Sequence, residues 1–278
     1  MGPTGTGKST FINLVSGSRL GVGTNLQSET ATMQVSQPFK LGSDRVVLVD
    51  TPGFDDTLRP DREILTMIAK YMAELHWRGV KIKGVIYLHR ITDNRMGGTA
   101  LRNFRMFEAL CGKDAMRNAV IVLNMWNELG NEMREAREKE LRESDIFFKH
   151  AVDAGADVMR HDGTLSSAST ILVHLLKQKP ASLQIQRETV NETKEISQTA
   201  AGIILLGELA TREGKQVEQL QRLRRELEEA REELQDEKGR LRDAGALVRR
   251  DPESDGAQSL GQRWWGRALR VVTRRQTA

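Results

Sequence analysis

The sequence predicts an α/β domain whose mostly parallel, doubly wound sheet is followed by a helical extension. Short, β-branched and almost continuously apolar runs at 45–50, 84–91 and 119–126 are typical of strands buried on both faces of a parallel sheet. Helical patterns lie between these runs, and strands that alternate with helices favour a doubly wound arrangement. After residue 180 the pattern is helical and contains no further strand signal.

The other elements of this predicted domain, residues 1–180, follow from the spacing of apolar side chains. Alternating apolar residues over 33–41 predict a half-exposed strand near the sheet edge that ends close to Pro38. Apolar residues three and four apart predict helices, because that spacing places them on one helix face. These helices cover 64–75, 101–111 and 166–178.

The extension, residues 181–250, is predicted to be helical with coiled-coil character. Its apolar residues follow a seven-residue repeat, and Arg and Glu at i, i+4 surround them. Glu237 is a polar break in this seam, and Gly239 and Gly245 weaken it. The seam predicts self-association, with a solvated single helix or an intramolecular hairpin as the alternative. It consists of Leu220, Leu223, Leu227, Ala230, Leu234, Leu241, Ala244 and Val248.

A basic tail, residues 251–278, closes the sequence. Its last 20 residues carry five Arg and no acidic residue. Four of these Arg form one helical stripe from Arg263 to Arg274, and Trp264 and Trp265 fall mostly away from it. This layout predicts a helix at an anionic membrane surface. The alternatives are that the two Trp dock on the domain or that the tail is disordered.

Composition limits the classes of protein. With 38% hydrophobic and 29% charged residues, the 278-residue chain is too apolar for a wholly disordered protein and too polar for a membrane protein. The single Cys111 excludes an internal disulfide framework and favours a reducing compartment. We therefore expect a cytoplasmic protein with a peripheral membrane contact through the tail. The net charge of +4 is weak evidence for nucleic acid, and no nucleic-acid partner is expected.

The strongest chemical signal is GPTGTGKS at residues 2–9, which matches G-x-x-x-x-G-K-[ST]. Glycines at these positions let the backbone wrap around phosphate oxygens and turn its N–H groups inward. Lys8 is expected to reach the β- and γ-phosphates, and Ser9 to offer its hydroxyl to Mg²⁺. A helix begins here and directs its partly positive N-terminus at the same anion. The predicted nucleotide-binding residues in this motif are Gly2, Gly5, Thr6, Gly7, Lys8, Ser9 and Thr10.

A second motif supports the first. The apolar run at 45–50 ends in Asp50, and the following residues complete D-x-x-G at Gly53. An acidic residue at the end of a buried strand is where a nucleotide-dependent enzyme holds Mg²⁺, usually through water. The N–H of Gly53 is predicted to sense a γ-phosphate. Asp50 is therefore a predicted metal ligand.

The stretch GPTGTGKSTFINLVSGS followed by LVDTPGFDD resembles GTPases of the translation-factor-related class, most of all their septin-like and immunity-associated branch. The segments VIYLHRITDNRMGGTALRNFRMF and VIVLNMW resemble the fungal proteins called G domain-containing. The resemblance covers about residues 1–200. It implies GTP with Mg²⁺, two mobile switches, and Ser9 paired with Thr30 as magnesium ligands. Thr24 and Thr32 are rivals to Thr30. Lys8, Thr30 and Gly53 are the implied catalytic residues.

Two departures from that family concern the base and the attacking water. No N/T-K-x-D motif follows the strand at 119–126. Asn124 is instead predicted to contact the base, and Trp126 to stack on it or pack beside it. The alternative is that both residues simply end the strand. The carboxylate that grips guanine is missing. Phe54 follows D-x-x-G and cannot orient water as Gln does. Residues that are candidates to compensate are Asp55, Asp56, His89, Arg90 and Arg95.

The third departure concerns the start of the chain, Met1, which lies inside the first motif. We expect a central strand before the Gly-rich loop, and its loss would leave backbone groups unpaired and Gly2 without its anchor. The expectation is that the natural chain begins earlier with a short β-branched run. The 278-residue chain would then be unstable or bind nucleotide poorly, unless another segment fills the gap.

The sequence thus predicts a GTP-binding protein with Mg²⁺-dependent, slow hydrolysis that acts as a switch or assembly GTPase. One alternative is an ATPase, because the base-reading motif is degenerate. The other is a nucleotide-binding coiled-coil scaffold that does not hydrolyse.

Overall fold

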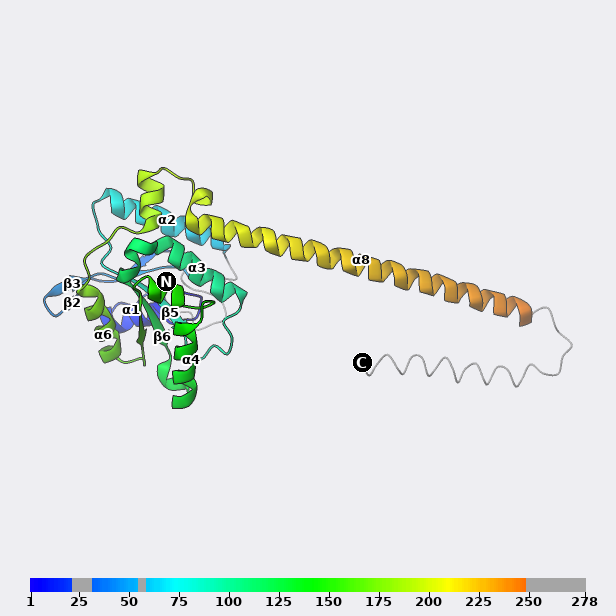
Figure 1. The fold of residues 1–278 in the computed structure, drawn as a ribbon, viewed down its shortest axis with the longest axis horizontal. Coiled ribbons are helices and arrows are strands. Elements are labelled where there is room, and N and C mark those ends of the chain that lie inside the picture. Colours follow the sequence, from blue (N-terminus) through cyan, green and yellow to red (C-terminus); the bar gives the residue numbers. More distant parts are fainter. Residues whose placement is uncertain (22–31, 55–58, 249–278) are drawn as a thin grey trace. The chain divides into compact units, whose positions relative to one another are not determined.

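The computed structural model describes residues 1–21, 32–54 and 59–248 (Figure 1). The chain forms two compact units, Met1–Thr211 and Arg212–Ala278. The predicted domain boundary after residue 180 therefore lies well before the point where the structure divides. Residues just beyond 180 pack in the first unit, since Leu183 and Ile185 are buried there.

A three-stranded parallel sheet organises the first unit. Its order is β5 (Val85–Arg90), β6 (Ala119–Asn124) and β7 (Asp157–Arg160). All six residues of β6 are buried because the strand is central and covered on both faces. Register pairs Arg90 with Asn124, so the carboxyl ends of β5 and β6 lie side by side. The two long apolar runs of the sequence are thus confirmed as parallel strands.

The residues before this sheet form two short antiparallel ladders. β1 (Gln34–Val35) pairs with β4 (Val49–Asp50), and β2 (Phe39–Leu41) pairs with β3 (Asp44–Val46). The predicted strand at 45–50 is therefore divided into two pieces, and the one at 33–41 is divided around Pro38. The division at Pro38 has a physical cause, because proline cannot donate a hydrogen bond to a ladder. Ser36 bridges the gap by bonding Leu48 through its backbone N–H and its hydroxyl oxygen.

Helices cover both faces of the parallel sheet, as the doubly wound prediction requires (Figure 1). Val120 and Val122 pack with α1 (Lys8–Ser16) and α6 (Leu165–Leu176), whereas Ile121 and Leu123 face α3 (Gly98–Cys111), α4 (Asn131–Glu143) and α5 (Lys149–Asp153). α2 (Asp61–Trp77) packs with α3, the short α7 (Gln184–Gln186) and the first turns of α8 (Ala200–Val248). Short helical segments of three to six residues lie at Lys113–Asn118, Trp126–Glu128, Arg187–Asn191 and Ile196–Gln198.

Helix α8 is the last described element. Its beginning is buried at Ala201 and Leu205, whereas five leucines further along are exposed: Leu220, Leu223, Leu227, Leu234 and Leu241. Among the described residues, none of the helices combines the length and the apolar character needed to cross a bilayer. The basic tail at 251–278 lies outside the described residues, and so do Thr24 and Thr30.

Candidate nucleotide site

The Gly-rich loop closes around the Lys8 side chain. Lys8 Nζ donates to the carbonyl oxygens of Gly2 at 3.0 Å and Pro3 at 2.8 Å. Thr6 is fully buried, and its hydroxyl also donates to the Pro3 oxygen, at 2.9 Å. The ammonium group is therefore held inside the loop that the sequence assigns to phosphates. Thr10 is exposed on the first turn of α1.

Gly7 shows why this loop requires glycine. It caps α1 with φ of 86°, a left-handed conformation that side chains disfavour. A Cβ atom at this position would lie 2.5 Å from Asn124 Nδ2. No side chain caps the start of α1, so its first N–H groups point toward the loop. This is the arrangement that binds phosphate at helix N-termini.

The predicted magnesium ligands Ser9 and Asp50 meet in the structure. Ser9 Oγ donates to Asp50 Oδ2 at 2.5 Å, although 41 residues separate them. Asp50 is almost fully buried, and its Oδ1 atom has no hydrogen-bond partner among the described residues. Hydroxyl and carboxylate oxygens are the ligands that Mg²⁺ prefers. A buried carboxylate oxygen without a partner beside a hydroxyl therefore fits the metal.

The D-x-x-G motif is locked against the Gly-rich loop by direct backbone contact. Thr4 N–H donates to the Phe54 oxygen at 3.2 Å, and Pro3 and Phe54 form an isolated parallel bridge. A Cβ on Gly53 would lie 2.5 Å from Thr4 Oγ1, so only glycine fits here. Sequence reasoning missed the contact between Thr4 and Gly53, because 49 residues separate them. Phe54 itself is 1% exposed and packs in the core beside α2.

Asn124 holds the loop from the other side. Its Nδ2 donates to the Thr6 oxygen at 2.8 Å, and its Oδ1 accepts from the Met125 N–H. Trp126, which was considered as a residue that stacks on the nucleotide base, is buried instead. The Trp126 ring is 6% exposed, and the Arg160 guanidinium carbon lies 4.2 Å from its centroid. Trp126 therefore packs, while Asn124 fixes the phosphate loop at the end of β6.

Among the described residues named as candidates to compensate for Phe54, Arg90 lies beside the Gly-rich loop. Its Nη1 lies 3.4 Å from the position of a Cβ on Gly5, so the guanidinium borders the phosphate loop. Asp93 holds it through an ion pair of 3.0 Å to Nε. His89 instead is buried, and burial lowers its pKa to about 4, so it is neutral at pH 7. Arg95 is exposed, and Asp55 and Asp56 lie outside the described residues.

Met1 occupies the place where the strand before the loop was expected. Its amine donates to the Ile86 oxygen at 2.6 Å, and the Leu88 N–H donates to the Met1 oxygen at 2.9 Å. The expectation that Gly2 loses its anchor is therefore wrong, because Met1 and Pro3 tie the loop to β5 and to Phe54. Burial lowers the pKa of the Met1 amine from 8.0 to about 5, with Lys8 acting in the same direction.

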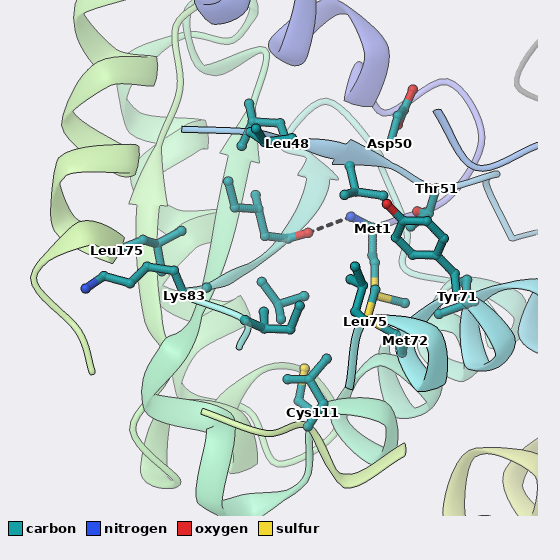
Figure 2. Close-up of a pocket in the computed structure, with 18 of the residues that line it drawn as sticks. Met1, Leu48, Asp50, Thr51, Tyr71, Met72, Leu75, Lys83, Cys111 and Leu175 are labelled. Carbon is teal, nitrogen blue, oxygen red and sulfur yellow. Dashed lines mark hydrogen bonds between the residues drawn. The ribbon is translucent and has the colours of Figure 1, made fainter. Parts of the chain in front are cut away.

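An apolar cavity of about 340 Å³ continues from Met1 (Figure 2). Figure 2 shows the amine of Met1 at its edge, with Met72, Leu75 and Cys111 on one side and Leu48 on the other. The backbone segments that flank it are 46–51 and 83–88, the neighbours of the expected central strand. The cavity beside Met1 thus lies where the sequence predicts a central strand.

Comparisons with known proteins agree with this geometry. Residues 1–125 match the family model described as 50S ribosome-binding GTPase. Among curated proteins, none matches this sequence. A structure of the chloroplast translocon components atToc33 and psToc159, from work on dimerization and GTPase activity, has a TM-score of 0.51 at 16% identity over 66% of this chain and 83% of that one.

Two further solved structures are similar at lower scores. Toc33 from Arabidopsis thaliana in complex with Mg²⁺ and GMPPNP has a TM-score of 0.47 at 17% identity, covering 63% of this chain and 80% of that one. The bacterial selenocysteine-specific elongation factor EF-Sec has a TM-score of 0.41 at 15% identity, covering 63% and 27%. Together with the structure at a TM-score of 0.51, the family match shows that the first unit of this chain has the fold of a P-loop GTPase.

Proposed function

We propose that this chain binds GTP with Mg²⁺ and hydrolyses it slowly. The observation that carries the proposal is the assembled phosphate site. Lys8 lies inside the Gly-rich loop, and Ser9 bonds the buried Asp50. In this site Lys8 would bind the β- and γ-phosphates, while Ser9 and Asp50 would hold the metal, with Thr30 as the further ligand implied by the family resemblance. Bound Mg²⁺ would neutralise charge on the phosphates during transfer to water.

Slow turnover is proposed because the side chain after D-x-x-G is apolar and buried. Phe54 offers no group that positions water, so the attacking water would lack the orientation that Gln gives in signalling GTPases. Arg90 is the cation at the edge of the loop, and we propose that it contacts phosphate oxygens. The remaining nucleotide-binding residues in the proposal are Gly2, Gly5, Thr6, Gly7, Thr10, Gly53 and Asn124.

The proposed preference for guanine rests on the family resemblance. Asn124 is engaged with Thr6 and Met125, and the family's guanine-binding carboxylate is absent from the sequence. An ATPase is therefore the second candidate. Competition of GTP and ATP for one fluorescent triphosphate analogue separates the two, because equal displacement would favour the ATPase.

We further propose that the protein is a switch or assembly GTPase of the septin-like branch. It would self-associate through residues 181–250, lie in the cytoplasm, and contact a membrane through residues 251–278. Single-turnover hydrolysis measured over a range of protein concentrations tests the enzymatic part. We expect slow release of phosphate that accelerates as concentration rises if a second copy contributes to the site. Absence of any phosphate release in Mg²⁺ would leave the third candidate, a scaffold that binds nucleotide without hydrolysis.

A further inference from the structure

An exposed leucine stripe runs along the part of α8 that belongs to the second unit. Leu220, Leu227, Leu234 and Leu241 recur every seven residues, and each is between 51% and 63% exposed. Leu223 and Ala230 lie three residues after the first two leucines, on the same face. A seven-residue apolar repeat on a helix is the geometry of a two-helix seam rather than of a solvated surface. We call these residues the α8 stripe.

The charges beside the stripe determine which helix would cover it. If the four leucines occupy the first heptad position, the flanking side chains on one edge are basic, and those on the other edge are acidic until the last heptad. The basic edge contains Arg224, Arg231 and Lys238, and the other edge contains Glu226, Glu233 and Arg240. All six side chains are exposed. Such edge charges set partner choice and orientation in coiled coils.

We propose that the α8 stripe is covered by the same stripe of a second copy of this chain, with the two helices parallel and in register. In that pairing each acidic residue faces the basic residue five positions further along the other helix. Glu226 meets Arg231, and Glu233 meets Lys238, each twice by symmetry. In an antiparallel pair, each edge faces its own equivalent, so the basic edge places Arg opposite Lys or Arg. On the other edge Glu226 faces Glu233, and an alignment that instead brings Glu226 opposite Arg240 still places Glu233 opposite its own equivalent. The charge pattern therefore favours the parallel pair.

Competing contacts on the helix itself do not change this preference. Arg222 Nε bonds Glu226 at 2.9 Å, but both side chains are more than half exposed, and an exposed i, i+4 pair is weak. Glu237 lies at a seam position and faces its equivalent in the parallel pair, which limits the strength of association. A parallel pair also brings the first units of both copies to the same end of the seam. The inference rests on the self-association proposed above and adds its partner and orientation.

Cysteine cross-linking of the full chain tests the orientation directly. The variants are Leu220→Cys and Leu241→Cys, with Glu232→Cys on the outward face as the matched control; the native Cys111 is buried. In a parallel, in-register pair, two copies of the same stripe variant form an intermolecular disulfide under mild oxidation. Two copies of the control do not. Disulfides only in a mixture of the two stripe variants would show an antiparallel pair and overturn the proposal. No disulfide in any sample, with monomers in sedimentation equilibrium, would overturn self-association as well.

Charge reversal provides a second test that does not perturb the leucines. The double variant Glu226→Lys/Glu233→Lys should raise the dissociation constant at least about tenfold at low salt, because four attractive contacts become repulsive. Mixing it with Arg231→Glu/Lys238→Glu should restore association. The control Glu229→Lys/Glu232→Lys makes the same charge change away from the seam and should have little effect.

An antiparallel pair would not respond in this way, because the reversal only exchanges one like-charged contact for another. Equal weakening by the seam variant and its control would therefore contradict the proposal. Nucleotide affinity is measured for every variant. Unchanged affinity shows that the G domain is intact, so a failed orientation test is distinguishable from a failed nucleotide site.

Discussion

The amine of Met1 predicts an unusual dependence of stability on pH. Its pKa is lowered from 8.0 to about 5, first by burial and then by Lys8, against the opposing charges of Asp50 and Cys111. A cationic group with a depressed folded-state pKa binds its proton more weakly in the folded than in the unfolded chain. Its contribution is therefore most favourable above about pH 8 and declines as the pH falls toward 5.

The size of this effect follows from the shift. Three pKa units correspond to about 4 kcal/mol of unfolding free energy over the whole range, of which roughly a third is already lost at pH 7 and roughly two thirds at pH 6. Replacing the amine by a peptide bond removes the loss. A Gly/Ser extension of about five residues before Met1 does only this. A Val-rich extension of equal length also places side chains in the cavity beside Met1.

We expect the Val-rich chain to be the more stable of the two extended chains. Each buried valine contributes about 1.5–3 kcal/mol and each ladder hydrogen bond about 0.5–1.5 kcal/mol, against about 1–2 kcal/mol for ordering each residue. The net gain should therefore be a few kcal/mol over the Gly/Ser chain.

Urea unfolding at pH 6 and pH 8, followed by the fluorescence of buried Trp126, measures both effects. The original chain should lose about 2 kcal/mol more than either extended chain between these two pH values. His89 and His161 also have lowered pKa values through burial, but they are present in all three chains and cancel in the comparison. An identical pH slope in all three chains would refute the buried-amine argument. A Val-rich chain no more stable than the Gly/Ser chain would refute the idea that a strand before Met1 packs in the cavity.

Four further predictions concern the phosphate loop. Gly7→Ala should weaken nucleotide binding in a fluorescence titration at least about tenfold, because the new Cβ meets Asn124 and φ is 86°. The control Gly17→Ala, where φ is 67° and the surrounding space is open, should leave binding unchanged in the same titration. Ser9→Ala should weaken binding in Mg²⁺ but not in EDTA, and equal weakening in both would contradict its role at the metal. Asn124→Ala should cost about 1–3 kcal/mol in urea unfolding, because it leaves the buried end of the loop unpaired, and an unaffected midpoint would count against this anchor. Arg90→Ala should slow phosphate release in single turnover while the protein still unfolds cooperatively, and an unchanged rate would exclude contact with the transferred phosphate.

Much of this architecture could be predicted from local sequence pattern. The parallel strands β5 and β6 have long β-branched runs, and the Gly-rich loop has a spacing tied to one kind of chemistry. β7 was missed because Asp157–Arg160 is only four residues long and half of them are charged, and only Val158 is buried in it. The division of the predicted strand at 45–50 also has no local signal, since Val47 and Leu48 are as suited to strand as their neighbours.

The contacts between distant segments could not be predicted from pattern. The approach of Thr4 to Gly53 and of Arg90 to Gly5 depends on how three strand ends converge, which no spacing in the sequence encodes. Asn124 was predicted to be at the site, but its bond to Thr6 is a property of the fold. The anchoring of the loop by Met1 likewise depends on the tertiary pairing with Ile86 and Leu88.

Nucleotide titration of the intact chain and of Lys8→Ala tests the central claim most directly. A fluorescent GTP analogue is titrated in Mg²⁺, and unlabelled GTP and ATP then compete for the site; near-equal urea midpoints establish that the variant is folded. The loop geometry, with Lys8 Nζ held between the Gly2 and Pro3 carbonyls, predicts saturable binding that Lys8→Ala abolishes. The proposed guanine preference, which rests on the family resemblance, predicts that GTP displaces the analogue more readily than ATP. Undiminished affinity in a folded Lys8→Ala protein would contradict the assignment of this loop as the triphosphate site.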